Sequence, residues 1–203
     1  VPTSSGKGSI KMRVHGRYKI ERRTGLTQKS YRKYEPELRE DFHCMCGYCG
    51  KSEAVTKKGF EIDHFVPQTL AKDLIDCYDN LVYSCFTCNR KKGAKWPTED
   101  SALAHNGIIG FCDPATAEFD THLQRDADGR IVSCSAVGKY MLKEAFQFDK
   151  RPTETVWRAM QVIEMKRDLR AKWDTLTPKE RDEYMQLDVE LESLLDYIFE
   201  KRE

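Results

Sequence analysis

Two Cys-x-x-Cys pairs carry the clearest chemistry in this sequence. Cys46 and Cys49 form the first pair, and Cys85 and Cys88 form the second. Each pair places two sulfur atoms on the same side of a tight bend, so two pairs supply the four-thiolate cage that Zn²⁺ prefers. A closed cage leaves no position for a substrate, and we therefore expect a structural zinc. Buried free cysteines and a redox pair are the alternatives, and Cys44 offers a competing ligand.

The segment between the two pairs holds side chains suited to hydrolysis. Asp63 and His64 are adjacent near its middle, Asn80 follows them, and Asn89 comes directly after the last cysteine. An imidazole with an ordinary pKa of about 6.5 can take a proton from water at neutral pH. An Asp-His dipeptide alone is equally typical of a half-buried histidine beside a turn aspartate. Its place between the cysteine pairs, together with both asparagines, favours a catalytic site.

Three short elements must position these side chains. The pattern predicts them at residues 60–64 (a strand), 81–84 (its antiparallel partner) and 86–92 (a short helix). Pro67 ends the first strand, and Gly93 stops the helix. These elements would then surround the Asp-His pair. The zinc would join the first cysteine pair, which precedes the first strand, to the second pair at the start of the helix.

Taken together and in this order, the residues resemble the HNH endonuclease motif. The resemblance rests on Asp63-His64-Phe65-Val66-Pro67, then Asn80-Leu81, then Cys85-x-x-Cys88-Asn89-Arg90-x-Lys92-Gly93. It covers about 50 of the 203 residues. It implies an α+β fold with a ββα-metal core and a structural zinc knuckle, to which the chain adds a basic N-terminal arm and a C-terminal helical region.

The resemblance also implies a role for each motif residue. His64 would be the general base that activates water, Asp63 a metal ligand, and Asn80 the residue that shapes the loop and holds the backbone around His64. Asn89 stands at the third motif position, where many family members have His. Two oxygen ligands suit Mg²⁺ better than a soft transition metal, so we expect Mg²⁺ with Mn²⁺ tolerated. The implied reaction is hydrolysis of phosphodiester bonds in DNA, and RNA shares the same phosphate chemistry.

Cations cluster beside this motif and near the N-terminus. Next to a phosphodiesterase site they favour contact with the nucleic acid backbone, although a solvated helix face would also explain them. The residues concerned are Arg90, Lys91, Lys92, Lys95, Arg22 and Arg23. Residues 1–34 carry a net charge of +9, which leaves −8 for the rest of the chain. We expect a flexible basic arm that binds phosphates; a solvated tail or an arm docked on an acidic protein is the alternative.

Beyond the arm, the chain is predicted to contain a zinc-stapled core at 35–97, an accessory hairpin and loop segment at 98–150, and a helical pair at 151–203. In the accessory segment a turn at 126–129 separates two strands, and His122 is expected to be structural, with phosphate contact as the alternative. Thr177 and Glu180 form a capping box at the start of the last helix. The acidic face of that helix would turn away from DNA, or would meet a partner subunit or a second copy.

Composition favours a soluble globular protein, with 33% charged and 39% hydrophobic residues. No apolar run approaches the ~20 residues of a transmembrane helix, and no signal peptide is visible. We expect a reducing cytoplasm and no membrane partner, with Cys77, Cys112 and Cys134 as small buried residues.

Three functions are compared. The first function is that of a metal-dependent endonuclease. The second, which is the alternative to the first, is that of a non-catalytic zinc module that binds nucleic acid or protein. The third is the nuclease effector of a bacterial anti-phage defence complex, held silent by a partner such as an ATPase subunit. It rests on a looser resemblance, since Asp113-Pro114, His122 and Asp126-x-x-Gly129-Arg130-Ile131 are similar to accessory segments of Septu-type nuclease subunits.

Overall fold

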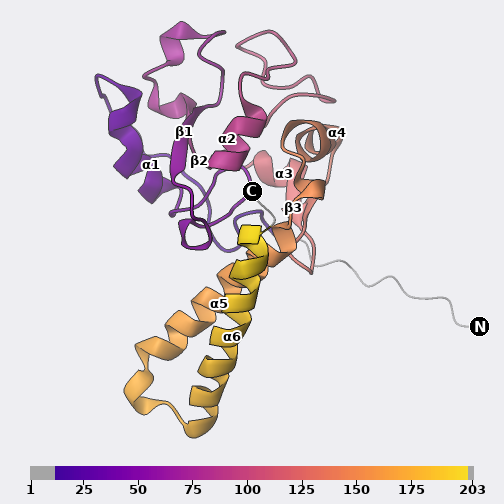
Figure 1. Ribbon diagram of the computed structural model, residues 1–203. Coiled ribbons are helices and arrows are strands. Elements are labelled where there is room, and N and C mark those ends of the chain that lie inside the picture. Colours follow the sequence, from indigo (N-terminus) through magenta and orange to yellow (C-terminus); the bar gives the residue numbers. More distant parts are fainter. Residues whose placement is uncertain (1–11, 201–203) are drawn as a thin grey trace, which may run out of the picture.

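Strand β1 (Phe60–His64) pairs antiparallel with strand β2 (Leu81–Cys85) in the computed structural model, which describes residues 12–200 (Figure 1). Asp63 lies opposite Val82, and His64 lies opposite Leu81. Helix α2 (Phe86–Lys92) follows β2 directly. All five residues of β2 are buried, and Leu81, Val82 and Tyr83 supply its large apolar side chains. The predicted strand, strand and helix are confirmed, and they form the unit that carries the Asp-His pair.

Short helical turns frame this unit. The turn η1 (Tyr31–Tyr34) leads into helix α1 (Glu35–Asp41), which has Pro36 in its first turn, the position that tolerates a missing backbone N–H. Three further 3₁₀ turns lie between the two cysteine pairs, at η2 (Glu53–Val55), η3 (Lys72–Leu74) and η4 (Tyr78–Asn80). Helix α1 contacts β2 and buries Leu38 against it.

The N-terminal segment differs from the predicted flexible arm. Residues 12–34 lie on the core, with Val14 and Ile20 buried. The backbone of Met12 pairs with that of Arg125, which adds an isolated bridge beside a hairpin far away in the sequence. Residues 1–11, the first part of the predicted arm, lie outside the described residues. The described part of the arm is therefore structural, because its apolar side chains find buried places between the knuckle and the accessory segment.

The accessory segment packs into the same hydrophobic core as the zinc-bearing unit. It holds α3 (Phe119–His122), the hairpin β3 (Leu123–Arg125) and β4 (Ile131–Ser133), and α4 (Ala136–Tyr140). Helix α4 runs into the π-helical turn η5 (Met141–Ala145), and a 3₁₀ turn η6 (Phe148–Lys150) follows. Gly138 lies inside α4, where a Cβ would stand 1.9 Å from the carbonyl oxygen of His122. The close approach of α3 and α4 explains why this residue is glycine.

Arg125 ties four distant segments together. Its side chain is fully buried, and its guanidinium donates to the carbonyls of Val14 at 2.8 Å, Gly129 at 2.6 Å and Cys49 at 2.7 Å. It also reaches the carbonyl of Thr153 at 3.5 Å. Burial lowers the pKa of Arg125 to about 10, so the group stays charged at neutral pH. A buried cation among carbonyl oxygens thus fixes the N-terminal segment, the knuckle, the hairpin and the next helix.

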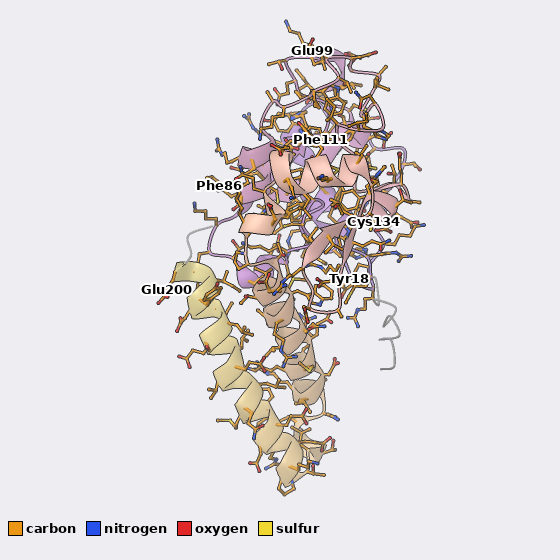
Figure 2. The ribbon with its side chains drawn as sticks, turned by 90° about the vertical axis from the view of Figure 1, so that its right-hand side faces the viewer. Tyr18, Phe86, Glu99, Phe111, Cys134 and Glu200 are labelled. Atoms are coloured by element: carbon orange, nitrogen blue, oxygen red, sulfur yellow. The ribbon has the colours of Figure 1, made fainter. Side chains whose placement is uncertain are left out.

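The C-terminal region is an antiparallel pair of long helices that projects from the rest of the molecule (Figures 1 and 2). Helix α5 (Thr153–Ala171) and helix α6 (Pro178–Glu200) are joined through the 3₁₀ turn η7 (Trp173–Thr175). The predicted capping box is confirmed: the backbone N–H and hydroxyl of Thr177 donate to the Glu180 carboxylate, and the Glu180 N–H donates to Thr177 Oγ1. Among residues 12–200, no helix is long and apolar enough to cross a membrane.

Candidate active site and zinc centre

The four predicted zinc ligands converge. The sulfur atoms of Cys46, Cys49, Cys85 and Cys88 all lie within 4.8 Å of one another, and all four residues are buried. The Cys49 and Cys85 sulfurs are 3.9 Å apart, close to the ~3.8 Å edge of a tetrahedron with zinc–sulfur bonds of about 2.3 Å. That separation is far beyond a disulfide bond of about 2.05 Å. The donor set fits zinc, and Cys44 lies outside it.

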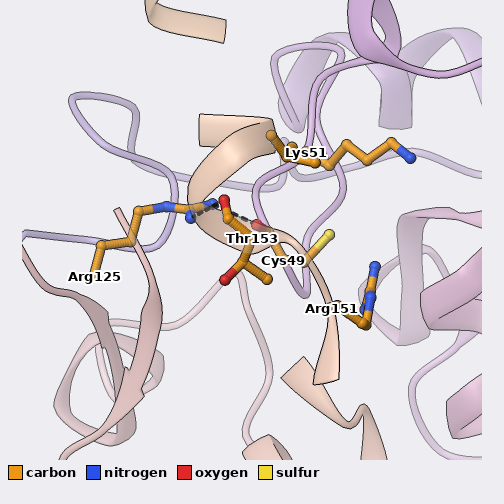
Figure 3. Close-up of a pocket in the computed structure, with 6 residues that line it drawn as sticks. Cys49, Lys51, Arg125, Arg151 and Thr153 are labelled. Carbon is orange, nitrogen blue, oxygen red and sulfur yellow. Dashed lines mark hydrogen bonds between the residues drawn. The ribbon is translucent and has the colours of Figure 1, made fainter. Parts of the chain in front are cut away.

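Cations surround this cluster. Figure 3 shows Cys49 in a pocket with Lys51 and Arg151, together with Arg125 and Thr153. The Arg151 guanidinium donates from Nη1 to the Cys88 sulfur at 3.2 Å, and Lys51 is 2% exposed. Zinc with four thiolates carries a net negative charge, so cations at this distance stabilise the loaded cage.

A buried histidine from the N-terminal segment supports the first cysteine turn. Burial lowers the pKa of His15 to about 4, which keeps the ring neutral. Its Nε2 lies 2.8 Å from the Gly47 carbonyl and 3.3 Å from that of Cys46. Because a carbonyl can only accept, Nε2 carries the proton. The sequence gives no local signal for this contact, since the partners are 32 residues apart.

His64 is held by hydrogen bonds at both ring nitrogens. Nε2 lies 2.9 Å from the carbonyl of Ile75, which can only accept, so this nitrogen carries the proton in the neutral ring. Nδ1 is then the acceptor, and the side-chain amide of Gln68 approaches it at 2.9 Å. The ring of Tyr31 packs edge-on with its centroid 4.7 Å from that of His64. The lone pair that a base would use is therefore on Nδ1, and Gln68 covers it.

Asn80 fixes the loop that follows His64. Its side-chain oxygen accepts from the Val66 N–H at 2.8 Å. Its amide donates to the carbonyls of Val66 at 3.1 Å and Leu74 at 3.3 Å, and its own backbone carbonyl accepts from Phe65 at 2.8 Å. Asn80 is buried, so each of its polar atoms is matched in a site without bulk water. These bonds set the backbone path immediately after the histidine.

Asp63 belongs to a buried polar cluster. Its Oδ2 accepts from the Tyr48 hydroxyl at 2.5 Å and lies 3.0 Å from Lys92 Nζ. Lys92 also donates to the His64 carbonyl at 2.7 Å. Burial raises the pKa of Asp63 above its ordinary value, whereas Lys92, Tyr48 and His64 act in the opposite direction. Both contacts occupy the same oxygen, and they orient the carboxylate and the peptide of the neighbouring histidine together.

Asn89 lies against Glu61, a residue that the sequence reasoning missed. The Asn89 amide nitrogen donates to Glu61 Oε2 at 2.6 Å, so this contact does not use the amide oxygen of Asn89. Glu61 and Asp63 are two residues apart on β1, so their side chains project from the same face of the strand. The alternation of side chains along a strand could have identified Glu61 from the sequence, because an acid two residues before a predicted metal ligand lies on the same face of the strand.

The donor atoms at this edge fit a hard divalent metal. Two carboxylates, Glu61 and Asp63, and the amide oxygen of Asn89 are the oxygen ligands that Mg²⁺ and Mn²⁺ accept, with water completing the shell. Within residues 12–200, no three His, Cys, Asp or Glu groups cluster here closely enough to form a complete cage.

The structure corrects two of the predicted phosphate-binding cations. Lys92 is fully buried beside Asp63. Arg22 is 8% exposed and forms a paired contact with the Asp113 carboxylate at 2.7 and 2.9 Å. Both cations form ion pairs with carboxylates of the protein, and each pair offsets part of the cost of taking its charges out of water. Neither side chain can reach a nucleic acid in this structure.

The other four cations differ in how free their charges are. Arg23 is 38% exposed and pairs with Glu40 and Asp41. Lys91 donates to the Gln147 side chain, and Lys95 reaches the last carbonyls of η5. Arg90 is 67% exposed and touches Glu61 at 3.5 Å. Arg90 is therefore the most exposed of the three cations at the end of α2.

Two of the remaining cysteines differ from prediction. Cys112 is buried as expected, but Cys77 is half-buried and Cys134 is exposed. Cys134 directly follows β4, where the hairpin edge meets solvent. His122 contacts Glu118 and Ser135, which gives it polar partners inside the accessory segment.

Comparison with known proteins gives one match. Residues 46–95 match the family described as HNH endonuclease, a range that includes all four zinc ligands and Asp63, His64, Asn80 and Asn89. The comparisons with curated proteins and with solved structures each found no match.

Proposed function

We propose that this chain, whose residues 46–95 match the HNH endonuclease family, is a metal-dependent endonuclease that hydrolyses phosphodiester bonds in DNA. The observation that carries the proposal is the hydrogen bonding of His64. Its Nε2–H donates a hydrogen bond to a backbone carbonyl, which leaves the Nδ1 lone pair as the only basic site of the neutral ring. A fixed tautomer of this kind is what a general base requires.

In the proposed reaction, His64 Nδ1 takes a proton from a water molecule as the water oxygen attacks phosphorus. The bond from phosphorus to the 3′ oxygen breaks, and this oxygen takes a proton from solvent water. The products are a 5′ phosphate and a 3′ hydroxyl. Before this step Gln68 must leave Nδ1, because its amide occupies the same lone pair. Gln68 is exposed, so it can turn away without disturbing buried structure.

Asp63 and Asn89 would hold the catalytic Mg²⁺ or Mn²⁺, with Glu61 beside them. When bound, such an ion neutralises charge on the phosphate and on the departing 3′ oxygen. Lys92 and Tyr48 act on the chain itself: they orient the Asp63 carboxylate, and Lys92 also holds the His64 carbonyl. Arg90 would meet the phosphate backbone near the site.

A partner protein is part of the proposal. The looser resemblance to Septu-type subunits suggests an effector in an anti-phage defence complex, which a partner such as an ATPase would release. The α5–α6 pair projects from the rest of the chain and is accessible for such an assembly or for a homodimer (Figure 1). A purified chain that nicks plasmid at full rate by itself would count against the regulated form of the proposal.

Supercoiled-plasmid cleavage tests the function directly. The wild-type chain and His64→Ala are compared with EDTA, Mg²⁺ and Mn²⁺, and zinc content is measured for each. We expect nicking only with added metal, its loss in His64→Ala at unchanged zinc content, and partial recovery of His64→Ala with added imidazole. His43→Asn is the matched control: His43 is an exposed histidine outside the site, and asparagine tolerates its positive φ of 54°. Undiminished cleavage by His64→Ala would exclude His64 as the base.

A further inference from the structure

A second group of metal-binding side chains lies outside the HNH-matching residues. His105, Glu118 and His122 place one ligand atom each within 4.8 Å of the other two. Glu118 Oε1 lies 2.9 Å from His105 Nε2 and 3.3 Å from His122 Nε2. We propose that these three side chains bind a second divalent metal of the zinc class. This proposal does not depend on the nuclease assignment, because it concerns the accessory segment alone.

The distances suit such an ion. A tetrahedral zinc with bonds of about 2.0–2.1 Å to nitrogen and oxygen separates its ligands by ~3.3–3.4 Å. The contact between His122 and Glu118 already has this length, and the contact between His105 and Glu118 must open by a few tenths of an ångström, on the order of a side-chain adjustment. Two imidazoles and one carboxylate favour zinc over magnesium, and the fourth position is left for water.

Local structure fixes two of the ligands on one short helix. Glu118 is the residue before α3 and His122 is the last residue of α3, so their spacing of four places both on one face. The ring of His122 is oriented by Ser135, whose Oγ lies 2.5 Å from Nδ1. That oxygen also accepts the Gly138 N–H at 2.9 Å as the cap of α4. With Nδ1–H donating to Ser135, the lone pair of Nε2 faces Glu118, as a metal ligand requires.

The third ligand comes from a tightly built loop. His105 and Gly110 form an isolated antiparallel bridge, and Asn106 Oδ1 accepts the N–H groups of Ile108 and Ile109 at 3.0 Å each. Gly110 has a φ of +129°, and a Cβ there would lie 2.5 Å from the Cα of His105. Glycine is therefore required for this close approach, which holds the His105 backbone in place.

Metal binding costs one weak contact. The Gly107 N–H approaches His105 Nδ1 at 3.3 Å, which is long for a hydrogen bond. When Nε2 binds a metal, the proton moves to Nδ1, and this contact is lost. The side chains of His105, Glu118 and His122 are 23%, 53% and 12% exposed, so an ion can enter from the Glu118 side. Without a metal, His122 takes the other tautomer: Nε2–H donates to Glu118 and the Ser135 hydroxyl donates to Nδ1. This hydrogen-bonded His-Glu-His group is the alternative that the test must distinguish from a metal site.

Counting the bound metal ions distinguishes a second metal site from a hydrogen-bonded His-Glu-His group without metal. The full chain is equilibrated with excess Zn²⁺, freed of loose ions by gel filtration, and analysed for zinc. We expect about two zinc ions per chain in the wild type, one in the four-cysteine cage and one here. Glu118→Gln keeps the shape of the side chain but removes its charge, and the double variant His105→Ala/His122→Ala removes both imidazoles. Both variants should retain about one zinc, and His43→Asn should match the wild type.

Titration with Co²⁺ guards against a variant that fails to fold. Charge transfer from thiolate to cobalt reports the four-cysteine cage, whereas the second ion adds only ligand-field absorption. We expect every variant to keep the thiolate signal and Glu118→Gln to bind the second ion more weakly by on the order of tenfold or more. A wild-type chain that saturates at about one equivalent, or a second ion that survives in the His105/His122 variant, would overturn the proposal.

Discussion

Arg151 donates a hydrogen bond to the sulfur of Cys88 at 3.2 Å, and this contact joins the start of the C-terminal helical pair to the zinc centre. The Nε atom of this guanidinium is buried there and has no hydrogen-bond partner within residues 12–200. Its charge therefore acts mainly on the thiolates. This side chain adds a direct contact with a zinc ligand to the link between the knuckle and α5 that Arg125 already provides.

The first prediction concerns that contact. Arg151→Met keeps the apolar part of the side chain and removes the charge, and we expect zinc to bind more weakly by ~10–100-fold, because outer contacts of this type tune metal affinity. Competition with a chromophoric chelator measures the change. Arg158→Met is the control, since Arg158 lies on α5, shortly after Arg151 in the chain, but pairs with Glu190 at the surface. Equal zinc affinity in both variants would show that Arg151 does not stabilise the cage.

The second prediction concerns the buried pair of Lys92 and Asp63. Lys92→Met leaves the Asp63 carboxylate unpaired in a buried site, which should cost about 3–5 kcal/mol of unfolding free energy. Urea unfolding followed by circular dichroism measures it. Arg90→Met on the same helix is 67% exposed and should change stability by less than about 1 kcal/mol. Adding Asp63→Asn to Lys92→Met should restore part of the loss; if the losses simply add, the two charges do not interact.

The third prediction concerns the amide that covers the base. Gln68→Ala removes the hydrogen bond to His64 Nδ1, which must break before water can be deprotonated. A hydrogen bond contributes about 1 kcal/mol net, so kcat should rise by up to ~5-fold. Single-turnover nicking at saturating metal is the measurement. A loss of more than about tenfold would instead show that Gln68 helps to place the water.

The fourth prediction concerns the start of α6. The backbone N–H of Thr177, Lys172 and the Thr177 hydroxyl lower the pKa of Glu180 from 4.5 to about 2. A carboxyl with a lowered pKa stabilises the fold above its ordinary pKa and loses that effect as pH falls. Wild type should therefore exceed Glu180→Gln in melting temperature at neutral pH, and the difference should shrink as pH falls from 4.5 towards 2. A difference that is independent of pH over that range would contradict the assignment.

Local patterns were sufficient for the zinc-bearing unit. The two cysteine pairs, the strand at 60–64 and the helix at 86–92 each carry their signal within a few neighbouring residues, and the structure has them where the sequence predicts. The capping box at Thr177 and Glu180 is local in the same sense.

Long-range partners explain what the sequence could not show. Lys92 looks like one of several helix cations, and only its contact with a carboxylate 29 positions earlier makes it a buried residue. Arg22 forms an ion pair with Asp113, 91 residues away, so a charge that was expected on a flexible arm lies inside the protein. Glu61 was within reach of sequence reasoning through strand alternation, but its contact with Asn89 depends on how α2 crosses β1.

The buried guanidinium of Arg125 limits how this nuclease-like unit can be cut or transplanted. A fragment that ends at residue 97 would keep every motif residue, yet the carbonyls of Val14 and Cys49 would lose their shared donor. The stretch that matches the HNH family therefore shares a buried hydrogen-bond donor with the accessory hairpin. A graft of this stretch onto another protein would keep that donor only if the hairpin were included.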